Sequence, residues 1–141
     1  MENTNKPKIL EWKDEYSVHV EEIDNQHKEM FNIVNNLISK LNSQQNESTI
    51  KEILNSIIRY KETHFATEEK YFDLFHYEGA EAHKIAHKSF AKHIEDLRSS
   101  KIDNTTTLAF ELIDYLEDWL INHLMNMDHK YVKCFLENGL H

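Results

Sequence analysis

Residues able to bind a metal lie on, or one residue from, the apolar stripes of the helices that this sequence predicts. They are His27, His64, Glu68, His83, His87, His123 and Asp128. Burying one polar group without a partner costs about 1–3 kcal/mol, so burying the whole set would cost on the order of 10 kcal/mol, comparable to the net stability of a domain. Imidazoles and carboxylates that converge from several helices are most simply satisfied by metal ions. The sequence therefore predicts a helical bundle built around a metal centre.

The donor set narrows the choice of metal. It holds imidazoles and carboxylates but no thiolate, which excludes iron–sulfur clusters and most structural zinc sites, and it is too rich in nitrogen for calcium or magnesium. The set is too large for one tetrahedral ion, so we expect two ions. If both ions are octahedral and share both carboxylates and one solvent oxygen, a single coordination position stays open, which suits a small diatomic molecule. Ligand chemistry alone leaves iron, manganese, copper and zinc as alternatives.

Four segments with apolar residues at helical spacing would position these ligands. They are 21–41, a segment from a cap at Ser48 or Thr49 to about 75, 81–97, and a segment from a cap at Asn104 or Thr105 to about 136. His64 and Glu68 are separated by one helical turn, as are His83 and His87, so each pair projects from one helix face.

Composition agrees with an all-α fold. The chain of 141 residues contains two glycines and one proline, too few for the turns of a sheet-rich protein. We expect one domain over 1–141, an up-down-up-down four-helix bundle over about 21–137 with an extended N-terminal arm over about 1–20. Trp12 should fold from this arm against the body of the bundle.

His123 and Asp128 are the pair that helical spacing does not explain. Five residues of α-helix turn through about 500°, which leaves Asp128 roughly 140° away from the face of His123. Either Asp128 reaches inward around the helix, or the backbone is overwound or widened between the two residues. A π-type bulge is a frequent device at functional sites.

Charge and cysteine content restrict the partners and the setting. The net charge of −9 argues against a nucleic acid or an anionic membrane as partner. Cys134, the single cysteine, indicates a reducing compartment. The N-terminus lacks an apolar signal core, and no apolar run approaches the ~20 residues that span a bilayer. We expect a soluble, cytoplasmic protein, a monomer or weak oligomer, whose protein partner is unknown.

The remaining histidines fit no apolar stripe and are expected at the surface; they are His19, His76, His93, His129 and His141. Glu69 follows Glu68 but lies off the stripe, so it is expected to be a solvated charge. Tyr60 or Tyr71 could donate a hydrogen bond behind the metal ligands.

The order of these motifs resembles that of the hemerythrin family. The segment from Trp12 to His27 reads W-x4-S-V-x-V-x2-I-D-x-Q-H, like the opening of that family. The pairs H-x3-E, H-x3-H and H-x4-D then follow in the family's order, and Trp119-Leu120-Ile121-Asn122-His123 precedes the last pair in the same way. Each pair alone would be a weak signal, whereas all of them in order over about 9–131 are highly specific.

The resemblance implies a four-helix bundle around a non-haem di-iron centre (Fe2+/Fe3+ with a bridging oxo or hydroxo group). Such a centre binds O2 reversibly for oxygen carriage, storage or delivery, and the protein is not an enzyme. One iron would be held by His83, His87 and His123. The other, which keeps the open position, would be held by His27 and His64. The bridging carboxylates would be Glu68 and Asp128.

An apolar pocket must protect bound O2 from water and protons. Helical geometry and the family pattern suggest Met30, Phe65, Trp119 and Leu124 as its lining. If Asn126 pointed inward, it would add polarity there and could speed autoxidation.

Three other functions fit the same residues less well. The chain could report O2, NO or redox state to a separate protein partner, which a pull-down with and without O2 would reveal. It could be a di-iron oxidase, a peroxidase or an NO-handling enzyme, but di-iron bundles that activate O2 tend to use more carboxylates. A bundle with a phosphorylatable histidine would need an exposed histidine near a cation.

Overall fold

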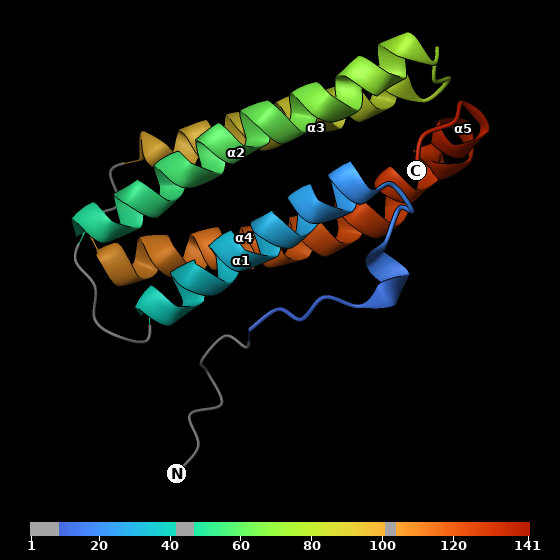
Figure 1. Cartoon of the computed structure of the whole chain (residues 1–141). Helices are drawn as coiled ribbons and strands as arrows, with labels where there is room; N and C mark the ends of the chain where they lie inside the picture. Colours follow the sequence, from blue (N-terminus) through green and yellow to red (C-terminus); the bar gives the residue numbers. More distant parts are fainter. Residues whose placement is uncertain (1–8, 42–46, 101–103) are drawn as a thin grey trace.

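The computed structural model of the chain describes residues 9–41, 47–100 and 104–141. Its four long helices run alternately up and down, with the α2–α3 pair lying over the α1–α4 pair (Figure 1). Their bounds are α1 Glu21–Leu41, α2 Glu47–Leu74, α3 Ala80–Arg98 and α4 Thr105–Asn126. No strand occurs in these described ranges. The expected all-α, up-down-up-down bundle is confirmed.

Each long helix turns one apolar face toward the centre of the bundle. On α1 that face comprises Ile23, Met30, Phe31, Val34, Leu37 and Ile38. α1 packs against α2 and α4, and α2 also packs against α3. None of the described helices combines the length and the apolar character that crossing a bilayer requires. The histidines of the stripes are therefore carried into the same interior as the apolar side chains around them.

The start of α4 agrees with the prediction from the sequence, whereas the start of α2 differs from it. The side-chain oxygen of Asn104 accepts a hydrogen bond from the main-chain N–H of Thr107 at 3.0 Å, so Asn104 caps α4 as expected. α2 begins at Glu47, one residue before the expected cap Ser48 and two before Thr49. Both expected caps lie inside the first helical turn, and the residue before Glu47 lies outside the described ranges.

The fourth helix does not continue to residue 136. α4 ends at Asn126, and the 3₁₀ helix η2 (Asp128–Tyr131) and the short helix α5 (Val132–Glu137) follow it. The main-chain N–H of Met127 still bonds four residues back, to His123 at 2.8 Å, but the N–H of Lys130 bonds only three residues back, to Met127 at 3.1 Å. The backbone is thus overwound rather than widened, because a 3₁₀ turn needs three residues. This tightening turns Asp128 into the interior, where its exposed fraction is 2%.

The described part of the N-terminal arm, residues 9–20, is fastened along α1. The side-chain amide of Asn35 accepts from the main-chain N–H of Leu10 at 2.7 Å and donates to its carbonyl at 2.9 Å. The indole of Trp12 meets the ring of Phe31 edge to face, with centroids 5.4 Å apart. The arm includes the short 3₁₀ helix η1 (Asp14–Tyr16). The part of the expected arm over residues 1–8 lies outside the described residues.

α2 ends in a left-handed cap. His76 has φ of +51°, and the main-chain N–H of Tyr77 reaches back to the carbonyl of Phe72 at 2.9 Å. Glycine usually occupies such a position because a Cβ is strained there. α3 begins soon after, with Gly79 at its N-cap.

Candidate metal centre

The structure brings together the side chains of all the residues that the sequence suggests as metal ligands. Each has an exposed fraction between 0% and 7%. They come from all four long helices and from η2. They are His27 on α1, His64 and Glu68 on α2, His83 and His87 on α3, His123 on α4 and Asp128 on η2.

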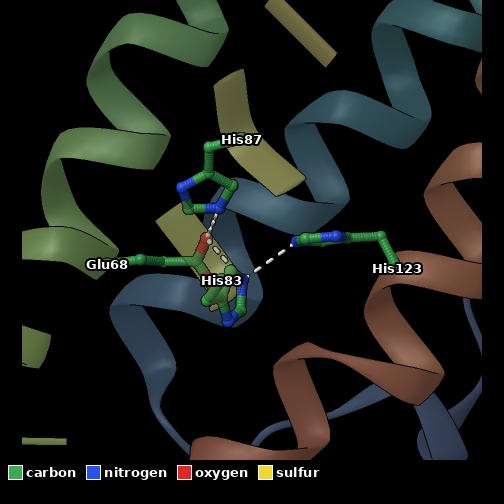
Figure 2. A group of neighbouring side chains, drawn as sticks. All are labelled: Glu68, His83, His87 and His123. Carbon is green, nitrogen blue, oxygen red and sulfur yellow. Dashed lines mark hydrogen bonds and ion pairs between the residues drawn. The ribbon is translucent and has the colours of Figure 1, made fainter. Parts of the chain in front are cut away.

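One group of ligand atoms gathers around Glu68. Figure 2 shows His83, His87 and His123 turned toward it from α3 and α4. His87 Nε2 lies 3.1 Å and His83 Nε2 lies 3.9 Å from Glu68 Oε1. The Nε2 atoms of His83 and His123 are 3.0 Å apart. These atoms lie within 4.8 Å of one another, close enough to share one ion.

A second group combines His27, His64 and Asp128 with the same Glu68. His27 Nε2 lies 3.0 Å from Asp128 Oδ2, and His64 Nε2 lies 3.3 Å from Glu68 Oε1. The other oxygen of Asp128 reaches the first group, 3.0 Å from His83 Nε2. Both carboxylates therefore lie between two sets of histidines, where a bridging ligand would have to lie.

Atoms at the centre that lack a hydrogen-bond partner indicate that these residues could hold metal ions. Glu68 Oε2 is buried without a partner among the described residues, and the close approaches of His27 Nε2 and Asp128 Oδ1 to their neighbours lack hydrogen-bond geometry. Two imidazole nitrogens that approach to 3.0 Å, as those of His83 and His123 do, cannot both satisfy their lone pairs with each other. Metal ions would accept these lone pairs and remove the cost of burying them.

The cluster holds its carboxylates ionised. Burial raises the pKa values of both acids and the charge of Asp128 also raises the pKa of Glu68, but the surrounding imidazoles outweigh these effects. The pKa of Asp128 therefore lies well below its ordinary value because of His123, His27 and His83, and the pKa of Glu68 is lowered as well. Ionised carboxylates are the form that binds metal.

Two of the histidines show opposite pKa shifts. Burial lowers the pKa of His64 to about 4. The charge of Glu68 raises this pKa without offsetting burial, and the neighbouring His27 lowers it further. Burial also disfavours the charged form of His27, but the adjacent Asp128 carboxylate raises its pKa overall. His64 is thus kept neutral, ready to bind a metal, over most of the pH range in which proteins are stable.

The Nδ1 atoms of two candidate ligands are held by residues whose role the sequence analysis missed. His64 Nδ1 lies 2.7 Å from the side-chain oxygen of Gln26, and His87 Nδ1 lies 2.8 Å from Glu69 Oε2. Glu69 is therefore not the solvated charge that was expected. Such bonds fix the ring orientation and leave Nε2 free for the metal. Gln26 immediately precedes His27, and Glu69 immediately follows Glu68. Their position next to candidate ligands was the one sign in the sequence that they could support the site.

Tyrosines also surround the centre, and one of them was not expected. The hydroxyl of Tyr60 donates to the main-chain carbonyl of Gln26, and its ring stacks on His64 with centroids 5.4 Å apart. Tyr71 instead bonds Glu22 at the surface. The unexpected residue, Tyr131, is fully buried, and its ring stacks on that of His83 on α3 with centroids 5.7 Å apart. Burial and then the charges of the two carboxylates raise its pKa well above the ordinary value, so its phenol stays protonated.

A small apolar cavity of about 10 Å³ adjoins the cluster. This is the volume that one water-sized molecule needs. Its lining comprises Met30, Tyr60, Lys61, His64, Phe65, Phe90, Trp119, Leu120, His123 and Asp128. Three of the four residues suggested for the pocket are among them. The fourth, Leu124, is buried but is not part of this lining. Asn126 is exposed and belongs to a separate open groove on α4.

The histidines expected at the surface stay away from the cluster. His19, His76, His93 and His141 are exposed. His129 is half-buried, and its ring nitrogen lies 3.5 Å from the main-chain carbonyl of Tyr16.

Comparison with known proteins gives one family. The family model described as the hemerythrin HHE cation binding domain matches residues 18–135. The bacteriohemerythrin of Clostridium acetobutylicum is 30% identical over 125 residues, which cover 86% of this chain and 97% of that protein. Myohemerythrin-1 of Phascolopsis gouldii is 31% identical over 125 residues, which cover 89% of this chain and 93% of that protein.

Solved structures agree with this result. A crystal structure of wild-type hemerythrin superimposes with a TM-score of 0.77 at 28% identity, over 90% of this chain and 98% of the other. A crystal structure of a hemerythrin mutant, in which alanine replaces a leucine, gives a TM-score of 0.76 at 27% identity, over 89% and 96%.

Proposed function

Because this chain belongs to the hemerythrin family, we propose that it binds O2 reversibly at a pair of iron ions and serves oxygen carriage, storage or delivery. The observation on which the proposal rests is the buried double cluster, in which two carboxylates lie between separate sets of histidines. A single ion would leave part of this cluster without a partner.

The residue roles follow from the two groups of atoms. We assign one iron to His83, His87 and His123. We assign the other to His27 and His64, and the bridging positions to Glu68 and Asp128. The second set has fewer histidines, and its His64 also lines the apolar cavity. His123 of the first set and the shared Asp128 line the cavity too, so it adjoins both proposed ion positions.

Bound to these residues, the iron pair would supply the electrons that O2 accepts and returns. The chain's own contribution is to exclude water and to withhold protons. Apart from the proposed ligands, the polar side-chain groups of the lining residues are the hydroxyl of Tyr60, the indole N–H of Trp119 and the ammonium of Lys61. The hydroxyl donates to a main-chain carbonyl, and burial followed by the nearby carboxylate charges raises its pKa well above the ordinary value.

The same features support carriage rather than catalysis. Both central carboxylates have lowered pKa values and contact histidines, so neither is a ready proton donor. An oxidase or peroxidase would need a group that delivers protons to the bound molecule. We propose that this chain has no catalytic turnover.

Metal analysis combined with a visible spectrum tests the proposal. We expect two iron ions per chain and absorption bands that appear with O2 and disappear when O2 is removed, over repeated cycles. His87→Ala should lower the iron content, whereas the exposed control His93→Ala should not. A reduced, iron-loaded sample without any spectral response to O2 would contradict the function, and equal iron loss in both variants would contradict the ligand assignment.

A further inference from the structure

We propose that Lys61 is the gate of the apolar cavity: its aliphatic stem closes the wall between cavity and solvent, and its ammonium group makes this opening favour small anions. The inference rests on the proposed function for its biological meaning. The physical claim, that small molecules reach the cavity past Lys61, can be tested without O2 chemistry.

The wall between the cavity and the solvent is short. Most of the lining side chains are buried, and only Lys61, Phe65 and Trp119 are partly exposed. A molecule that enters from solvent must therefore pass one of these three side chains. Lys61 lies on α2 one turn before Phe65, so the two side chains project from the same face of that helix and both line the cavity.

Two of these three side chains are held in place by other rings. Phe65 stacks on His87 with centroids 3.7 Å apart and planes 7° from parallel, and it also meets Phe90. Trp119 stacks on His123 at 4.2 Å and 11° and packs on Phe90 at 4.2 Å. Displacing either ring would break contacts with a proposed metal ligand.

Lys61 has no such restraint. Over residues 9–41, 47–100 and 104–141, no hydrogen bond, ion pair or ring contact holds its side chain. Its ammonium group acts on α3 only from a distance: the pKa of Glu95 is lowered mainly by Arg98 and to a lesser extent by Lys61. A flexible stem that packs on an apolar opening, with its charge in water, can swing away at little cost. Lys61 is thus the movable part of the wall.

The charge of this side chain adds selectivity. Lys61 is the one cation among the residues that line the cavity, and the other charged group there is the carboxylate of Asp128. The chain as a whole carries a net charge of −9, so anions meet a repulsive surface elsewhere. A positive group at the opening raises the local concentration of small anions and their rate of association. Neutral molecules such as O2 should be affected only by the stem.

Two variants separate the stem from the charge, and a third serves as the control. Lys61→Ala removes both, Lys61→Met keeps an unbranched apolar stem without the charge, and Lys88→Ala removes an exposed lysine elsewhere on the surface. On the full chain loaded with zinc, which accepts the same donor atoms and has no redox chemistry, the rate constant for quenching of Trp119 fluorescence by dissolved O2 measures the entry of a small neutral molecule into the cavity. On the iron-loaded chain, the rates of O2 release and of azide association are measured by stopped flow.

Lys61→Ala should speed O2 release about tenfold, the factor that corresponds to exposing about two buried methylene groups, and it should raise the quenching rate constant. Lys61→Met should leave both rates near those of the unmodified chain, but it should slow azide association and reduce its dependence on salt. Unchanged quenching in Lys61→Ala would overturn the gate, even if O2 binds as proposed. Azide association that is insensitive to Lys61→Met would overturn the anion preference. Faster quenching in a chain that binds no O2 at its metal centre would support the gate and refute the proposed function.

Discussion

Removing the carboxylate of Glu69 should weaken metal binding although Glu69 is not a proposed ligand. Its Oε2 lies 2.8 Å from His87 Nδ1, while the opposite nitrogen of the same ring faces Glu68 at 3.1 Å. Glu69→Ala would leave the ring without the partner that orients it. The ring could then rotate or form the wrong tautomer, and its Nε2 would be a poorer donor.

The size of this effect follows from the geometry. The side chain of Glu69 is 34% exposed, so water weakens the bond, whereas the imidazole is 2% exposed. Loss of such a partner typically lowers metal affinity 10- to 100-fold, which is about 1.4–2.7 kcal/mol. Because Glu69 is partly exposed, we expect Glu69→Ala to lower the metal affinity by about tenfold, near the lower end of this range. Glu69→Gln keeps an acceptor without the charge and should lower the metal affinity less.

Competition with a chromophoric chelator measures the affinity. The matched control is Glu62→Ala, which removes a charge of the same sign from an exposed position of the same helix. Far-ultraviolet circular dichroism on each variant shows that the bundle is intact. If Glu69→Ala binds metal as tightly as the unmodified chain, or loses no more affinity than Glu62→Ala, the orienting role is wrong.

Two further predictions concern stability. With the metal chelated, the free energy of unfolding should fall as the pH falls from 6.5 to about 4, because unfolded His64 takes up a proton in that window while buried His64 stays neutral; the loss can reach ~3 kcal/mol. Urea titrations against His64→Gln measure it, and a stability difference independent of pH would contradict it. His76→Gly should stabilise the chain by about 0.5–1 kcal/mol, because φ of +51° strains an L-residue and glycine adopts it freely at some entropic cost. A lower midpoint in thermal unfolding would show that the cap is not strained.

The bundle and the clustering of the candidate ligands were accessible from the sequence because both depend on local periodicity. Apolar side chains on α1 recur with the helical period, and His27 falls on the same stripe, so its burial follows from its position alone. The spacing of His64 and Glu68 fixes a common face in the same way. Long helices with few glycines leave few other ways to arrange such stripes.

What could not be predicted depends on contacts between segments or on local backbone detail. The bond from Glu69 to His87 joins α2 to α3, and no property of Glu69 itself marks it. Tyr131 enters the centre only because α4 gives way to η2. Sequence spacing showed that helical geometry does not place His123 and Asp128 on one face. It left three explanations open: Asp128 reaching around the helix, an overwound backbone or a widened one.

The rings that seal the cavity also brace the histidines. Phe65 lies flat on His87 and Trp119 lies flat on His123. Trimming either ring to widen the space for a gas molecule would therefore loosen an imidazole that we propose as a metal ligand. If the proposed function holds, gas exchange and metal retention are coupled at these two positions, and faster exchange without loss of metal requires changes elsewhere.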